Sequence, residues 1–289
     1  MSLDELWGTL FDFTDYGELL ALLGNTVLAG AVLGVLGGLI GYFVMARDLA
    51  FAVHGISELS FAGASAALLL GVNVVAGSIV GSLIAAVLIG LLGVRARDRN
   101  SIIGVLMPFG LGLGVLFLAL YPGRSSNKFG LLTGQIVAVD NPQLTSLVTV
   151  AIVVVGALAV IWRPLLFASL DEDVAAARGV PVRGLSIGFM VLLALATAVS
   201  LHIVGALLVL ALLVTPAAAA LRVAANPPLV VALSVLFATV STVGGILLAL
   251  GSSIPISPYI TTISFAIYMV CRVLGAVRRR SPRALVTAG

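Results

Sequence analysis

Long apolar runs, separated by short stretches that contain charge, proline or glycine, set the pattern of this chain. A hydrocarbon layer about 30 Å thick is crossed by about 20 apolar helical residues. The runs that approach this length are Leu19–Met45, Ala50–Val72, Val75–Gly93, Ile102–Tyr121, Leu144–Trp162, Leu185–Ser200, Val204–Ala220, Leu229–Leu250 and Ile260–Leu274. The pattern predicts an all-α, polytopic membrane helical bundle with 8–9 transmembrane helices.

Two of these spans are inferred from one uninterrupted run. Residues 185–221 contain no charged side chain, and as a single helix at about 1.5 Å per residue they would be much longer than the bilayer is thick. We therefore expect a turn near His202–Gly205 and a kink at Thr215-Pro216. The alternative is an eight-helix protein in which Val204–Ala220 is re-entrant. The run Leu131–Val139 is too short to cross and is expected to lie on the outer face.

Composition excludes a soluble domain. Only 9% of the residues are charged while 61% are hydrophobic, and the mean hydropathy is +1.24; a soluble domain has roughly 25% charged residues. The single cysteine, Cys271, excludes an internal disulfide.

Basic residues predict the orientation. In the nine-span arrangement all of the 15 lysines and arginines except Arg124 and Lys128 fall on one side, which the positive-inside rule assigns to the cytoplasm. Residues 1–18 then form an acidic extracytoplasmic segment, residues 19–277 the transmembrane domain, and residues 278–289 a basic cytoplasmic tail. The first basic residue is Arg47, so no secretory leader is expected.

Ionisable side chains within the apolar runs are the candidate functional residues, because charge is costly in a membrane. Glu58 is the only acid away from the loops, and the two histidines, His54 and His202, also fall within or at the end of apolar spans. His54 and Glu58 are one helical turn apart, so an imidazole and a carboxylate can hold one divalent cation, with Ser57 and Ser60 as further oxygen donors. The alternatives are a structural His–Glu hydrogen bond and, for His202, a side chain that faces water.

The segment Ala168–Gly184 predicts a short helix between two spans. Ser169 or Asp171 can cap it, its first turn is acidic, and glycine with proline stops it. Such an element is either a solvated loop or a helix on which a cytoplasmic partner docks. The docking residues would be Asp171, Glu172, Asp173, Ala176 and Gly179.

Three stretches in this order resemble the permease subunits of zinc and manganese ABC importers, the ABC-3 group. They are Arg47–Gly63 (RDLAFAVHGISELSFAG), Asp171–Val182 (DEDVAAARGVPV) and Ser200–Ala220 (SLHIVGALLVLALLVTPAAAA). The resemblance runs from about Leu33 to Leu274. In place of His54 the family usually has Asp, and in place of Glu58 it has His, so the two donor types are exchanged.

The resemblance implies a homodimeric permease in a bacterial plasma membrane, surrounded by lipid and without nucleic acid as a partner. It implies a coupling helix at about residues 171–177 that docks on a cytoplasmic ATPase subunit, and an extracytoplasmic lipoprotein that delivers the metal. Mn²⁺ or Zn²⁺ would be the transported ion, and no cofactor is expected to be permanently bound.

Other functional classes fit less well. The only lysine, Lys128, follows Asn127, so the chain lacks the Gly-Lys of a Walker A loop and would not hydrolyse ATP itself. The chain has no HExxH motif, which disfavours an intramembrane metalloenzyme. A permease for an iron–siderophore or cobalamin would be expected to lack the His/Glu pair, and an ion-coupled secondary carrier would need no docking helix.

Overall fold

The computed structural model describes residues 17, 23–92, 96–123, 131, 139–205, 208–250 and 256–280, without the side chains of residues 96–98, 202 and 278–280. Throughout these ranges the regular structure is α-helix, and no strand occurs in them. The helices are α3 (Gly24–Ala46), α4 (Ala50–Leu70), α5 (Val74–Leu92), α6 (Ala96–Leu120), α8 (Asn141–Leu170), α9 (Glu172–Ala177), α10 (Val182–Val204), α11 (Val209–Leu213), α12 (Thr215–Val223), α13 (Pro227–Ala249) and α14 (Ile256–Arg280). The predicted segment Leu131–Val139 lies largely outside the described residues.

Within the described ranges, eight helices are long and apolar enough to cross a membrane. They are α3, α4, α5, α6, α8, α10, α13 and α14, and each overlaps a predicted span. The chain is therefore a multi-pass helical membrane protein, as the sequence predicts. α8 continues past the predicted end at Trp162, through Arg163 and Pro164, to Leu170.

The predicted span Val204–Ala220 is wrong as a single helix. α10 ends at Val204, where Gly205 adopts a positive φ of 83°, and this confirms the predicted turn. Beyond it lie two short helices, α11 and α12, which are separated at Val214. Pro216 lies in the first turn of α12, where its missing N–H is not needed, so Thr215-Pro216 starts a new helix instead of kinking a continuous one.

Helices α3 and α13 pack antiparallel through small residues and hydroxyl groups. Ser234 donates a hydrogen bond of 2.9 Å to the carbonyl of Gly38, and Thr242 donates one of 2.8 Å to the carbonyl of Gly30. Higher numbers on α13 thus face lower numbers on α3, and α13 begins where α3 ends. Glycine permits this close approach of two helix backbones, a common way of packing helices in membranes.

Contacts between helix ends also show which ends of the bundle α11 and α12 connect. The end of α3 and the start of α10 lie together, since Arg47 donates a hydrogen bond to Ser186. α10 consequently finishes at the opposite end of the bundle, whereas α13 begins at the end where α3 finishes. Residues 208–223 therefore connect opposite ends, as a ninth passage would, and do not return to the end they left. Which end faces the cytoplasm stays a prediction.

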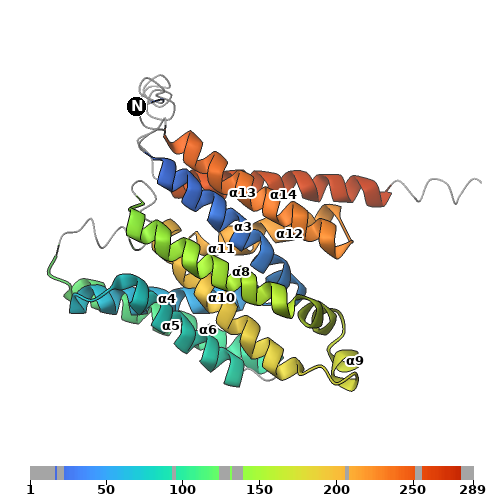
Figure 1. Cartoon of the computed structure of the whole chain (residues 1–289), viewed down its shortest axis with the longest axis horizontal. Coiled ribbons are helices and arrows are strands. Elements are labelled where there is room, and N and C mark those ends of the chain that lie inside the picture. The colour runs from blue at the N-terminus through green and yellow to red at the C-terminus, as the bar shows by residue number, and fades with distance from the viewer. Residues whose placement is uncertain are drawn as a thin grey trace, which may run out of the picture.

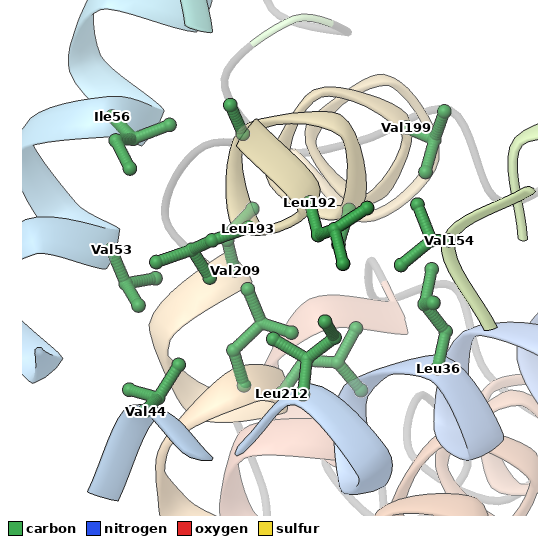
Figure 2. Packing of buried hydrophobic residues seen from close by; sticks show 14 of the residues in the cluster. Leu36, Val44, Val53, Ile56, Val154, Leu192, Leu193, Val199, Val209 and Leu212 are labelled. Atoms are coloured by element: carbon green, nitrogen blue, oxygen red, sulfur yellow. The ribbon is translucent and has the colours of Figure 1, made fainter. Parts of the chain in front are cut away.

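The helices form two groups joined at a shared core (Figure 1). One group consists of α4, α5, α6 and α10, and the other of α3, α12, α13 and α14, with α8 and α11 between them. At the junction, Figure 2 shows the apolar side chains of α3, α4, α8, α10 and α11 in contact, among them Leu36, Val53, Leu193, Val209 and Leu212. The short α11 thus fills the space between the two groups.

We expect Gly38→Ala to destabilise the protein. An added Cβ would collide with the backbone of Ser234 and Val235, which cannot rotate away. Overpacking of this kind costs about 1–3 kcal/mol, so the temperature of unfolding in detergent, followed by size-exclusion recovery after heating, should fall. Gly112→Ala on α6 is the matched control, because a Cβ there meets no atom within 4 Å. Equal melting of the two variants would contradict the proposed close packing.

Candidate metal site and docking helix

The candidate metal residues lie in the first half of α4. This helix begins at Ala50, just after the short connection from α3. It ends at Gly71, whose left-handed conformation (φ 70°) lets its N–H reach the carbonyls of the last turn. His54 and Glu58 occupy consecutive turns of the helix, as their spacing predicts. Gly110 of α6 lies against the backbone of Glu58, and this close contact fixes the side of α4 that α6 covers.

His54 and Glu58 approach each other without forming a hydrogen bond. His54 Nδ1 and Glu58 Oε1 are 3.7 Å apart, beyond the usual length of such a bond. His54 Nδ1 and Glu58 Oε2 have no hydrogen-bond partner in the described structure, although both atoms are buried. The Glu58 side chain is 9% exposed and that of His54 33%. The pair therefore offers unused lone pairs, with access from the imidazole side.

The two serines next to this pair have different roles. Ser60 is hydrogen-bonded to α5, with 2.8 Å between its Oγ and that of Ser78, and Ser78 in turn donates to the carbonyl of Ala198 on α10. Ser60 and Ser78 together thus link three helices, α4, α5 and α10. Ser57 is fully buried and its hydroxyl has no partner among the described residues. Of the two predicted oxygen donors, Ser57 is the one that stays available.

His202 lies in the last turn of α10, and its side chain is outside the described residues. α4 and α10 start at the same end of the bundle, and Ser60 lies level with Ala198 through Ser78. His54 precedes Ser60 while His202 follows Ala198, so at 1.5 Å per residue the two histidines are about 15 Å apart along the helices. The structure does not bring His202 to the pair within one chain. Among the described residues, no three His, Cys, Asp or Glu side chains form a cluster for a metal.

The short helix that the sequence predicts between the two spans is present as α9. Asp171 ends α8 and also caps α9, its carboxylate accepting a hydrogen bond of 2.9 Å from the N–H of Val174. Gly179, with φ 80°, ends the turn that follows, as its position predicts. Ala175 is buried against the bundle, whereas Asp171, Glu172, Asp173, Ala176 and Gly179 are exposed. Figure 1 shows α9 at the end of the bundle, beyond α8 and α10.

One residue with many contacts was missed by sequence reasoning. Arg47, counted there only as a basic residue that sets orientation, lies between α3 and α4 and donates hydrogen bonds to Ser169 at the end of α8 and Ser186 at the start of α10. Burial lowers the pKa of its guanidinium below the ordinary value, and the nearby Glu172 carboxylate opposes that shift. Its position at the start of the stretch RDLAFAVHGISELSFAG was the available signal.

The chain is a bundle of membrane helices. One helix carries a histidine and a carboxylate that are not hydrogen-bonded to each other, and a short exposed helix lies at one end of the bundle. These are the features of a membrane transport subunit. Residues 20–275 match the ABC 3 transport family, and the chain belongs to this family.

Relatives with assigned names cover most of the chain. It is 29% identical over 225 residues to the manganese transport system membrane protein MntC of Halalkalibacterium halodurans, an alignment that covers 78% of this chain and 77% of MntC. It is 27% identical over 229 residues to the high-affinity zinc uptake system membrane protein ZnuB of Haemophilus influenzae, which covers 79% and 88% of the two chains. The solved structure of PsaBC from Streptococcus pneumoniae in complex with Fab has a TM-score of 0.80 at 25% identity, over 90% of this chain and 95% of that one.

Asp171→Ala should loosen α9 specifically. The loss of an N-cap acceptor costs about 1 kcal/mol, which corresponds to roughly fivefold faster amide hydrogen exchange in the helix where exchange occurs by local opening. Mass spectrometry of a peptide that covers residues 172–177 would measure this rate. Asp173→Ala is the control, because Asp173 is exposed within the first turn while the Asp171 side chain makes the capping bond. Equal protection in both variants would show that the cap does not hold α9.

Proposed function

We propose that the chain is the membrane permease subunit of an ATP-driven importer for a divalent transition metal, Mn²⁺ or Zn²⁺. The observation that carries this proposal is the His54–Glu58 pair: an imidazole and a largely buried carboxylate lie 3.7 Å apart on one membrane helix, where ionisable groups are costly, and His54 Nδ1 and Glu58 Oε2 have no hydrogen-bond partner among the described residues. Membership of the ABC 3 transport family and relatives named for manganese and zinc uptake support it.

The donor set fits a first-row divalent ion. A neutral imidazole and a carboxylate both bind Mn²⁺ and Zn²⁺, and the negative carboxylate offsets part of the charge that enters the bundle. Two protein donors leave the remaining coordination positions to water, to Ser57 or to further groups. Bringing an ion to this depth without such ligands would cost far more, since the surrounding residues of α4 are mainly apolar.

The energy for transport would come from a separate cytoplasmic ATPase subunit that docks on α9. Exposed acidic and small residues on this helix support the assignment, as does its placement at the end of the bundle. An extracytoplasmic metal-binding lipoprotein would deliver the ion, and two copies of the chain would form the transporter. In this arrangement the chain lies in a bacterial plasma membrane with residues 1–18 outside and residues 278–289 in the cytoplasm.

Glu58→Gln tests the metal site. The amide keeps the shape of the side chain and removes its charge, so uptake of Mn²⁺ and Zn²⁺ into vesicles that contain the complete transporter should fall to background. Co-purification with the ATPase should be unchanged. Ser241→Ala is a suitable control, because it removes a buried hydroxyl that bonds only within α13. Normal metal uptake by the Gln variant would mean that the pair is structural.

Ala176→Arg tests the docking helix. A long cation on the exposed side of α9 should obstruct a partner surface without disturbing the bundle, because the buried contact of α9 is made by Ala175. We expect uptake and metal-stimulated ATP hydrolysis to fall at least tenfold together, while Ala176→Ser leaves both intact. Full activity of the Arg variant, inserted in the membrane at normal amount, would exclude α9 as the docking element.

A further inference from the structure

The junction between α3 and α4 is connected to the helices on either side of α9 by a single side chain. Arg47 Nη1 donates a hydrogen bond of 3.3 Å to Ser169 Oγ in the last turn of α8, and its Nη2 donates to Ser186 Oγ near the start of α10. These two serines belong to the helices that enter and leave α9. The guanidinium thus holds both ends of the α9 connection at once.

The acceptor in α8 is set up for this contact. The Ser169 hydroxyl donates its own proton to the carbonyl of Leu165 at 2.6 Å, which leaves its lone pairs for Arg47. Burial lowers the pKa of the Arg47 guanidinium, the Glu172 carboxylate in the first turn of α9 opposes that shift, and the charge of Arg99 adds to it. A planar guanidinium with several fixed donors can bond both serine hydroxyls together, which the single ammonium of lysine does less well.

Along the chain, Arg47 is joined by a very short connection to α4, the helix that carries the candidate metal pair. The junction consists of Arg47, Asp48 and Leu49, and Asp48 has a positive φ of 53°, which is uncommon for a residue with a side chain. The Asp48 carbonyl accepts a hydrogen bond of 3.5 Å from Arg99 at the start of α6, and the Leu49 N–H donates to Val44 at 2.8 Å. α4 begins at the next residue and carries His54 and Glu58.

We infer that Arg47 is a positioning residue that transmits displacement of α9 to α4, and so links the docking helix to the candidate metal pair. This inference rests on the proposed function, in which α9 receives the movement of the ATPase. When α9 shifts, the ends of α8 and α10 shift with it, and their hydroxyl groups pull on the guanidinium. Because the junction is short and held by Arg99, the pull reaches the first turns of α4 and is not absorbed in a loop.

A purely structural role would have a different signature. If Arg47 only secures the bundle, its loss lowers stability and the amount of protein, while each assembled transporter still moves the normal number of ions per ATP. If it transmits movement, the assembled transporter hydrolyses ATP with few ions moved. The ratio of metal uptake to ATP hydrolysis therefore separates the two roles.

The experiment uses the complete transporter in lipid vesicles, with Mn²⁺ as the probe, and measures uptake and ATP hydrolysis in the same preparation. Arg47→Met removes the donors and keeps most of the volume; Ser169→Ala with Ser186→Ala removes the acceptors and leaves Arg47 in place. Arg163→Met, at an exposed position of α8, is the control for loss of an arginine. Arg47→Lys tests whether a positive charge at this position, without the guanidinium geometry, is sufficient for the normal number of ions moved per ATP.

We expect Arg47→Met and the double serine variant each to lower the number of ions moved per ATP at least tenfold, with no further loss when the changes are combined. Arg47→Lys should recover the ratio only in part, and Arg163→Met should match the wild type. A normal ratio in the double serine variant would overturn the inference, even if Arg47→Met fails to assemble. If the wild-type transporter itself shows no ATP-dependent Mn²⁺ uptake, the proposed function fails first; if it does and the variants match it, only the inference fails.

Discussion

The absence of water in the bilayer is the constraint from which this structure follows. Backbone groups without water must be paired internally, which explains why the regular structure of the described residues is entirely helical. The hydrophobic effect cannot hold helices together in lipid, so contacts between small residues and hydroxyl groups do so, as between α3 and α13 or through Ser60 and Ser78. Several buried hydroxyl groups also have no partner among the described residues, but His54 and Glu58 differ from these hydroxyls in being ionisable, which makes the pair the candidate site for a ligand.

Much of the fold is predictable from the sequence because lipid makes hydropathy informative. The eight long helices, the turn at Gly205 and the short α9 with its Asp171 cap follow from local rules about apolar length, glycine and capping. The division into α11 and α12 follows only in part, because Thr215-Pro216 marks its place but does not show that the proline starts a new helix instead of kinking a continuous one. α8 also extends beyond the predicted end, since Arg163 and Pro164 mark the end of an apolar run without ending the helix.

The candidate site is predictable only in part, for a similar reason. The helical spacing of His54 and Glu58 is a local property, so their shared face follows from sequence. Whether Ser57 or Ser60 is available depends on α5, and the distance of His202 from the pair depends on how α4 and α10 are aligned. Arg47 illustrates the limit most clearly, because its partners Ser169 and Ser186 are remote in sequence and nothing local indicates them.

α9 and the candidate metal pair are connected through fewer residues in the structure than their separation in the sequence suggests. Residues 171–177 are far from His54 in sequence, yet Arg47 touches the helices beside α9 and lies only a short junction from the start of α4. The Asp48 backbone and its contact with Arg99 restrict that junction, so a force applied at one end has few bonds to deform. Rigid helices with short connections transmit small shifts because a packed interior does not deform continuously. The contacts of Arg47 and the short junction after it thus form a direct structural connection between the helices beside α9 and the first turns of α4.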